Sequence, residues 1–510
     1  MTLILAITPI LVILVLMVGL RWGAARAGAV GYVTAFMIAI LFFGAGTELL
    51  AYSHAKAFFL SVDVLFIIWA AFLLYRVADE AGAIKTIGQA LPHLTPIKGL
   101  QALLIGWIFA SFLQGVGGFG VPVAVIAPIL IGLGFSPLSA VVIPSIGHGW
   151  AVTFGSLGSS FLALMASTGL SADQLAAPSA LFLGIACIAT GPMVAHAAGG
   201  WQTVRQIFIP TIIVGTVMAF IQYIVVTNGF WYIGSFIAGI IGLAVGIPLA
   251  LNSKKKNNKT DGQLNVRALI IALSGYILLI VITLIIQLVP GIKSLLSVVS
   301  IQLEFPEIVT KLDYITPAGT GREIILFRHT GMILIYASIM AYLIYRKAGL
   351  YSQGSIKSIL NGTVRRVMSS SVSIASMVTM AVIMQQSGMT DTIARGLADG
   401  FGSFYPIVAP WIGALGAFMT GSNTNSNVVF GALQQRTAEL LGYSIAVILA
   451  AQTSGAALGS VMAPTKVVVG ASTAGLGNRE GDIMRKLVVY ASILIILMSI
   501  FTVIVVILAK

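Results

Sequence analysis

The feature that most constrains this chain is a glycine-rich break inside an apolar segment. Residues Ser111 to Pro122 read SFLQGVGGFGVP and interrupt what would otherwise be one hydrophobic helix. In hydrocarbon every backbone N–H and C=O must be paired, so a non-helical segment is tolerated there only inside protein or beside a wet cavity. If the chain lies in a membrane, this break predicts a binding site.

Composition places the chain in a membrane. Of its 510 residues 58% are hydrophobic and only 8% are charged, against about a quarter charged in soluble domains. The formal charge of +13 resides in short loops between apolar runs, as membrane orientation requires, so we expect a lipid bilayer and no nucleic acid as partner. Cys187 is the one cysteine, which provides no disulfide framework and no metal-ligand spacing.

The apolar runs, each near the ~20 residues that cross a bilayer, predict about twelve membrane-spanning helices. The basic loops between them are assigned to the cytoplasm, which leaves both termini outside. The most basic loop carries Lys254, Lys255, Lys256 and Lys259. The uninterrupted spans are expected at residues 1–20, 28–43, 57–75, 179–198, 205–226, 230–251, 266–288, 323–345, 368–386 and 482–508.

Four further apolar segments are interrupted. Residues 99–134, broken at Gly115 to Gly120, and residues 406–439, broken at Gly421 to Asn427, predict two re-entrant hairpins. Discontinuous spanning helices are expected at 137–165, which contains Pro144 and several glycines, and at 443–469, broken at Gln452 to Ser460. The mixed-charge connection 290–322 is expected outside, and residues 355–368 predict an interfacial helix.

The interrupted segments also indicate an internal repeat. FLQG at Phe112–Gly115 corresponds to FMTG at Phe418–Gly421, an offset of 306 residues (418 minus 112). Each unit contains an odd number of crossings, so the second is inverted relative to the first. The predicted division is a first repeat at 1–204, linking spans with a basic cytoplasmic loop at 205–265, and a second repeat at 266–510. This is the all-α, inverted-repeat architecture of secondary transporters.

We expect the hairpin tips to form one binding site for a small carboxylate. Helix N-termini favour anions, glycines let backbone approach a ligand, and neutral hydroxyls and amides bind it without a buried charge. A single glycine run is more typical of close helix packing, but two polar breaks at matched positions favour binding. The candidate residues are Gln114, Gly115, Gly117, Gly118, Gly120, Gly421, Ser422, Asn423, Thr424, Asn425, Ser426, Asn427, Ser145, Thr453 and Ser454.

These segments resemble a known family, the bacterial lactate permeases. The resemblance lies in SFLQGVGGFGVPVAV at 111–125, GLGFSPL at 132–138, TGSNTNSNVVFG at 420–431 and APTKVVVGASTAGLGNREGD at 463–482. It implies a transporter of the bacterial cell membrane that imports L-lactate, D-lactate or glycolate, generally with protons. Family members usually carry a glutamate at the position of Gln114 and an aspartate at that of Asn423, so both candidate acids are neutral here.

Other titratable groups are therefore candidates for ion coupling. Asp63 lies inside an apolar span, where a carboxylate is costly, and His148 lies in the first discontinuous helix, where it could carry a proton near neutral pH. His196 and His329 lie nearer span ends, and Lys466 is read as an interfacial anchor in preference to an attractor of the substrate anion. Sodium coupling through carbonyls of the breaks, with Ser145, Thr453 or Ser454, remains an alternative.

Other classes of protein fit less well. A membrane-embedded enzyme would need a nucleophile with its base or a metal cluster, and the chain contains neither HExxH nor GxSxG. A channel would use a repeated filter loop, whereas the two breaks differ in chemistry. An exchanger of another small organic anion remains open, as do the direction of transport and the oligomeric state, with a homodimer among the alternatives. No cofactor is expected.

Overall fold

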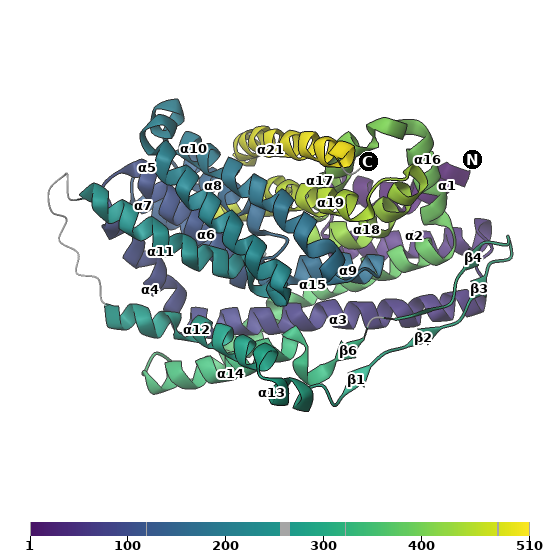
Figure 1. Ribbon diagram of the computed structural model, residues 1–510, viewed down its shortest axis with the longest axis horizontal. Helices are drawn as coiled ribbons and strands as arrows, with labels where there is room; N and C mark the ends of the chain where they lie inside the picture. Colours follow the sequence, from purple (N-terminus) through teal and green to yellow (C-terminus); the bar gives the residue numbers. More distant parts are fainter. Residues whose placement is uncertain (1, 119, 255–265, 322, 477–478, 509–510) are drawn as a thin grey trace.

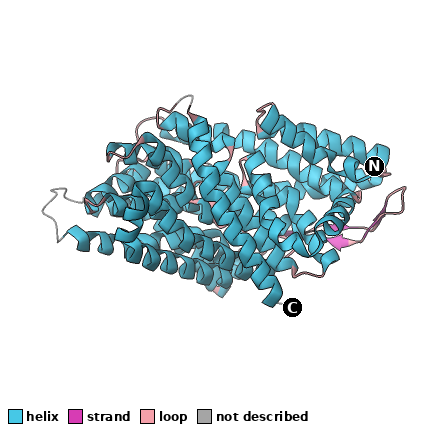
Figure 2. Ribbon diagram, turned by 90° about the horizontal axis from the view of Figure 1, so that it is seen from above, coloured by secondary structure: helices cyan, strands magenta, loops and turns pink. Residues whose placement is uncertain are grey.

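The computed structural model describes residues 2–118, 120–254, 266–321, 323–476 and 479–508. Helices make up most of this part of the chain, and strands are confined to one end of the molecule (Figure 2). Within the same residues, eleven helices are long and apolar enough to cross a membrane. The chain is an all-α polytopic membrane protein.

The described part of the first half of the chain contains the helices α1 to α11, with short 3₁₀ and π-helical segments between them (Figure 1). A π-helical stretch at Ala102–Phe109 precedes α6. The helices are α1 Thr2–Leu14, α2 Ala24–Phe42, α3 Thr47–Glu80, α4 Ala83–Ala90, α5 Lys98–Gln101, α6 Ala110–Val116, α7 Val121–Gly132, α8 Pro137–Gly147, α9 Ser159–Thr168, α10 Ala172–Val225 and α11 Gly234–Lys254.

The second half repeats the order of two broken pairs followed by a long helix. Here α17, α18, α19, α20 and α21 follow one another as α6, α7, α8, α9 and α10 do in the first half. The helices are α12 Val266–Leu288, α13 Pro290–Leu295, α14 Thr330–Lys347, α15 Ser355–Gln386, α16 Met389–Phe401, α17 Tyr405–Thr420, α18 Asn423–Leu441, α19 Ile445–Gly459, α20 Pro464–Thr473 and α21 Glu480–Leu508.

Several predicted span boundaries need correction. The span predicted at 266–288 matches α12. The spans predicted at 179–198 and 205–226 are two parts of α10, which bends where Gly199 and Gly200 leave the helical conformation. The interfacial helix predicted at 355–368 is the first part of α15, which continues without interruption to Gln386.

The connection predicted at 290–322 contains a β-ribbon. Three antiparallel pairs form it: β1 Ser300–Ile301 with β6 Ile324–Ile325, β2 Glu304–Phe305 with β5 Gly319–Thr320, and β3 Ile308–Val309 with β4 Ile315–Thr316. The ribbon runs beside α3 (Figure 1). Because β6 belongs to it, the span predicted from Glu323 begins instead at Thr330.

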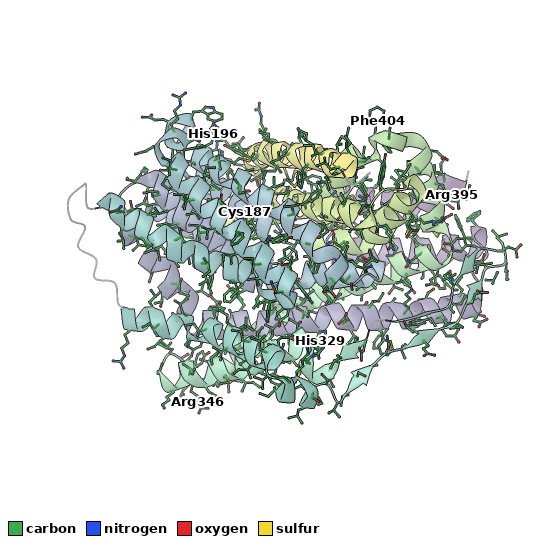
Figure 3. All side chains as sticks on the ribbon, viewed as in Figure 1. Cys187, His196, His329, Arg346, Arg395 and Phe404 are labelled. Atoms are coloured by element: carbon green, nitrogen blue, oxygen red, sulfur yellow. The ribbon has the colours of Figure 1, made fainter. Side chains whose placement is uncertain are left out.

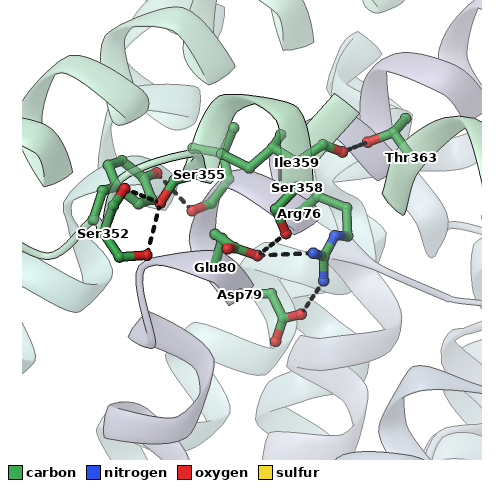
Figure 4. Close-up of polar contacts among 10 residues, drawn as sticks. Arg76, Asp79, Glu80, Ser352, Ser355, Ser358, Ile359 and Thr363 are labelled. Carbon is green, nitrogen blue, oxygen red and sulfur yellow. Dashed lines mark hydrogen bonds and ion pairs between the residues drawn. The ribbon is translucent and has the colours of Figure 1, made fainter. Parts of the chain in front are cut away.

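An ion-pair cluster joins α3 to α15 at the end of the molecule away from the ribbon. The Arg76 guanidinium lies 2.7 Å from an Asp79 carboxylate oxygen and 2.9 Å from a Glu80 oxygen, and the Ser358 hydroxyl donates to Glu80 at 2.9 Å (Figure 4). The sequence assigns this end to the cytoplasm. Of the predicted basic loop, Lys255, Lys256 and Lys259 lie outside the described residues.

Small residues allow α17 and α19 to cross at backbone contact. A Cβ added at Gly413 would lie 2.1 Å from the Gln452 carbonyl oxygen, and one added at Gly455 would lie 1.9 Å from that of Pro410. Close approach of this kind is how helices pack in membranes, where Gly and Ala line the interface. The crossing fixes α19 against the hairpin formed by α17 and α18.

Candidate functional site

The first broken helix supplies one wall of the site. Helix α8 ends at Gly147, and the chain passes through two 3₁₀ turns, Gly149–Ala151 and Ser156–Gly158, before α9 begins at Ser159. Leu157 has a φ of 54°, a left-handed conformation that interrupts helical geometry. The discontinuity expected within 137–165 is therefore present.

The second broken helix is interrupted later than expected. The break predicted at Gln452 to Ser460 is wrong, because α19 continues to Gly459 and is followed by the 3₁₀ turn Ser460–Met462. The first proline after α19 is Pro464, and a proline forces the preceding residue out of the helical region. Ala463 accordingly has extended backbone (φ −62°, ψ 135°), and α20 starts at Pro464.

The second hairpin tip is shorter than expected. The break predicted from Gly421 to Asn427 contains only Gly421 and Ser422, and Asn423 is the first residue of α18. Gly421 has a left-handed φ of 70°, and the Ser422 hydroxyl accepts from the Asn425 N–H at 3.3 Å. A serine cap satisfies an orphan donor of the first turn, so the helix starts at once and places Asn423 to Asn427 in its first turns.

Four side chains from the hairpin and both broken segments meet in a buried polar cluster. The Thr153 and Thr453 hydroxyls lie 3.1 Å apart. Asn423 donates its side-chain N–H to Thr153 at 3.0 Å, and Asn427 donates to Thr453 at 2.9 Å. All four are at most 3% exposed. Residues 300 positions apart in the chain thus share one hydrogen-bond network.

The other polar residues of the second tip reach three different elements. Thr424 shares a 3.0 Å hydrogen bond with Ser160 of α9. Asn425 donates to Ser373 of α15 at 3.0 Å. Ser426 donates to the Gly413 carbonyl at 2.8 Å. The tip is therefore bonded to α9, α15 and α17 at once.

The asparagine side chains leave their oxygens unpaired. Asn427 also donates to the Ser160 carbonyl at 2.9 Å, and since a carbonyl can only accept, the NH₂ group must face it. Among the described residues no partner reaches the buried Oδ1 atoms of Asn423, Asn425 and Asn427, or Oε1 of Gln114. Burying such a group without a partner is costly, so these four oxygens are candidates to accept a hydrogen bond from a ligand.

The residues of the first hairpin tip contact different parts of the molecule. A Cβ added at Gly118, whose φ is 55°, would lie 1.8 Å from the Ser156 hydroxyl, and Gln114 lies beside the same position. Both therefore lie against the first broken segment. Gly115 instead packs on Phe236 of α11 and Gly117 on Tyr75 of α3, while Gly120 faces Val469 of α20.

Helix α20 links the two tips. A Cβ added at Gly421 would lie 2.4 Å from the Thr465 hydroxyl, and one at Gly120 would lie 3.8 Å from Val469. Thr465 and Val469 are four residues apart and so share one face of the helix. Between them in sequence, the half-buried Lys466 donates to the Ser460 hydroxyl at 3.0 Å. The tips are thus connected through α20 and through the first broken segment.

Two predicted residues lie outside the network. Ser145 donates to the Val141 carbonyl within α8, and Ser454 donates to the Ala451 carbonyl within α19. Thr453 and Ser454 lie inside α19 and not in a break; the predicted role of these residues in sodium coupling stays a prediction. Thr453 reaches the site through its hydroxyl and through its carbonyl, which accepts from the Thr153 hydroxyl at 3.2 Å.

His148 is fully buried in the first broken segment. Its Nδ1 donates to the Pro144 carbonyl at 2.6 Å, which leaves Nε2 as the atom with a lone pair. No partner among the described residues reaches that Nε2. The ring can therefore accept a hydrogen bond at this position.

Asp63 forms a buried pair that the sequence did not predict. His329 Nε2 lies 2.7 Å from Asp63 Oδ1, and the His329 ring stacks on Phe66 at 4.9 Å. Figure 3 labels His329, just below α3 in that view. The Gly331 N–H donates to His329 Nδ1, so Nδ1 is the acceptor and Nε2 carries the hydrogen. The other histidine expected near a span end, His196, hydrogen-bonds Tyr490.

A cavity of about 510 Å³ lies beside this pair. It is bounded by α3, including Asp63, by the β-ribbon, and by Ser167 and Val428 of α9 and α18. Ser167 also donates to the Asn427 carbonyl at 3.0 Å. The cavity thus extends from the ribbon to the edge of the polar cluster.

Several residues of the network were not predicted. Thr153 lies within the first break and Ser160 just after it, so their place in or beside an expected discontinuity was the available signal. Gln452, which donates to the Ser426 hydroxyl at 3.1 Å, was assigned to a break and is helical. Ser373 carried no signal, because it lies inside an ordinary long helix.

Comparison with known proteins identifies relatives across the whole length. The profile of a family described as L-lactate permease matches residues 2–509. An L-lactate permease of Streptococcus iniae is 32% identical over 386 residues, covering 74% of this chain and 78% of the relative. The glycolate permease GlcA of Escherichia coli is 26% identical over 542 residues, covering 98% of this chain and 94% of the relative.

A solved structure of similar shape is the YdaH transporter of Alcanivorax borkumensis. It is 14% identical with a TM-score of 0.45, and the match covers 87% of this chain and 85% of that chain.

Proposed function

The chain belongs to the L-lactate permease family and is a membrane transporter, and from that premise we propose that it carries lactate and glycolate across the bacterial cell membrane by ion-coupled transport. These 2-hydroxymonocarboxylates have a carboxylate that only accepts hydrogen bonds and a hydroxyl that also donates. The site is expected to provide partners for both.

The observation that carries the proposal is the buried polar cluster with its unpaired oxygens. Asn423 and Asn427 hold both broken segments together through their NH₂ groups and keep Oδ1 free to accept. Such an oxygen suits the substrate hydroxyl. The N–H groups of Asn423 and Thr424 in the first turn of α18 have no acceptor within the helix and suit the carboxylate.

Alternating access follows from the proposed inverted repeats. We assign the first repeat to 1–204, the linking segment to 205–265 and the second repeat to 266–510, with both termini outside. Tip residues of the second repeat bond to α9 of the first, so relative movement of the repeats would break and remake contacts at the substrate. Rocking of one repeat against the other around a fixed site is the usual form of such transport.

Proton coupling is the first form of the proposal. Gln114 and Asn423 cannot ionise, so the proton must use other groups. His148 offers an Nε2 without a partner among the described residues in the first broken segment, and Asp63, which contacts His329, lines the cavity that reaches the edge of the cluster. Either group would carry a proton into the membrane without requiring the two amides.

Sodium coupling is the second form, and the unpaired oxygens favour it. Unwound or side-chain oxygens coordinate Na⁺ in transporters of this architecture. Four buried amide oxygens without partners, those of Gln114, Asn423, Asn425 and Asn427, are suitable ligands. A cation there would replace the donor that each oxygen lacks.

Uptake into proteoliposomes tests both forms. Radiolabelled L-lactate and glycolate are offered with a proton gradient, a sodium gradient or neither, and empty liposomes serve as control. Accumulation with one gradient identifies the coupling ion. Failure of both acids to accumulate or to exchange would refute the proposed substrate, and exchange without dependence on either gradient would refute ion coupling.

A further inference from the structure

We propose that Lys466 binds the carboxylate of the transported acid. This inference deepens the proposed function and rests on it. The argument uses three observations: the charge balance around Lys466, its position between the two hairpin tips, and the shortage of free donors in the asparagine cluster.

The charge of Lys466 is not compensated by the protein. Its ammonium donates to the Ser460 hydroxyl, and the ion pairs found among the described residues do not include it. A half-buried cation at membrane depth ordinarily pairs with an anion. An ammonium has three donors, so two remain for a ligand after the bond to Ser460.

The position of Lys466 is set by residues on either side of it. Thr465 contacts Gly421 at the second tip, and Val469 contacts Gly120 at the first. Ser460, the partner of the ammonium, begins the interruption of the second broken helix. Gly149 of the first broken segment would meet Val461 with an added Cβ at 3.1 Å. Lys466 therefore lies where both tips and both interruptions approach one another.

The asparagine cluster offers few free donors to a carboxylate. The NH₂ group of Asn427 makes two hydrogen bonds to the protein, those of Asn423 and Asn425 make one each, and the three Oδ1 atoms are acceptors without a partner among the described residues. A hydrogen-bond acceptor such as an amide oxygen repels the substrate carboxylate and accepts a hydrogen bond from the substrate hydroxyl. Besides the N–H groups of the first turn of α18, the carboxylate of a hydroxyacid would gain from a cation, and Lys466 has two donors left for a ligand.

The experiment compares Lys466→Met and Lys466→Arg with Lys98→Met as the matched control. Lys98 is also a lysine near a hairpin that donates to a single oxygen, the Gly134 carbonyl at 3.0 Å, but it is exposed. Each purified protein is titrated with L-lactate, and its uptake is measured in proteoliposomes. Thermal unfolding in detergent reports whether each variant is folded.

We expect Lys466→Met to raise the Kd for lactate by about 30-fold or more, as loss of one partner of a buried charge pair does. Lys466→Arg keeps the charge and should retain measurable binding, and Lys98→Met should bind as the wild type does. Lactamide, which has the hydroxyl but no carboxylate, should show the same weak affinity for wild type and Lys466→Met.

The outcomes separate this inference from the proposed function. If the wild type transports lactate and folded Lys466→Met binds it within threefold of the wild-type Kd, Lys466 is an interfacial anchor and the inference is wrong. If Lys466→Met does not fold, Lys466→Arg provides the test. A folded Lys466→Arg protein that shows no measurable binding of lactate, although it keeps the charge, would also contradict the inference. If the wild type neither binds nor transports lactate or glycolate, the proposed function fails first.

Discussion

Two partly buried cations show how differently this protein treats charge. Arg76 joins α3 to α15 and contacts two carboxylates, at 2.7 and 2.9 Å, with a side chain 22% exposed (Figure 4). Lys466 begins α20 and contacts one serine hydroxyl. Arg76, which joins two helices, has carboxylates as counter-ions. For Lys466, which has no ion pair among the described residues, we propose the substrate as the missing anion.

The largest expected difference comes from removing each cation in turn. Lys466→Met should abolish most lactate uptake at low substrate concentration while Tm changes little, because no protein ion pair is lost. Arg76→Met should keep the Kd for lactate within about twofold and lower Tm, because Asp79 and Glu80 lose their partner. Titration and thermal unfolding of both variants check this. An equal rise of the Kd for lactate in both variants would contradict the proposed difference between the roles of Arg76 and Lys466.

A second prediction concerns the backbone at the first tip. Gly118→Ala places a Cβ within 1.8 Å of the Ser156 hydroxyl at a φ of 55°, at a cost of about 2–4 kcal/mol for strain and overlap. We expect uptake to fall by about tenfold or more. Gly132→Ala is the control, since Gly132 ends α7 with open space around it. Equal activity of the two variants would mean that the tip need not contact the broken segment.

A third, smaller effect is expected in the asparagine cluster. Asn425→Ala removes an unpaired oxygen together with the bond to Ser373, and loss of one hydrogen bond of about 1 kcal/mol corresponds to a roughly fivefold weaker Kd for lactate. Asn361→Ala, an exposed asparagine on α15, should have no effect. Calorimetric titration of both distinguishes them. Unchanged binding by Asn425→Ala would remove this residue from the site.

The sequence predicted elements well where hydrophobicity decides them. Residues 266–288 are a long apolar run for which only a membrane-spanning helix was predicted, and α12 has those bounds. The interruption in 137–165 was marked by Pro144 and several glycines. Such signals are local, so they can be recognised without the folded structure.

One error is local: Ser422 caps α18 through Asn425, three residues on, and converts a polar stretch from loop to helix. The other errors arise where a contact distant in sequence decides. Gln452 was assigned to a break because glycine and serine follow it, yet packing of Gly455 against Pro410 holds that stretch in α19. His329 was given little weight near a span end, and its bond to Asp63 depends on the distance between α3 and α14. None of these distant partners can be read from neighbouring residues.

The smallest predicted effect tests whether the neutral amide at position 114 matters to charge balance. Gln114 is 2% exposed, lies beside Gly118, and leaves Oε1 unpaired. In Gln114→Glu the protonated side chain has nearly the same shape as the amide. The ionised side chain would repel the substrate carboxylate, which we place near Lys466. Uptake by the variant should therefore match the wild type at low pH and fall below it as pH rises, measured between roughly pH 5 and pH 8. Gln353→Glu, in an exposed loop, should keep a constant ratio to the wild type. If the ratio of Gln114→Glu uptake to wild-type uptake is also constant across this pH range, residue 114 lies too far from the bound acid for its charge to matter. The contrast between a cation with carboxylate partners and one without would then concern Lys466 alone.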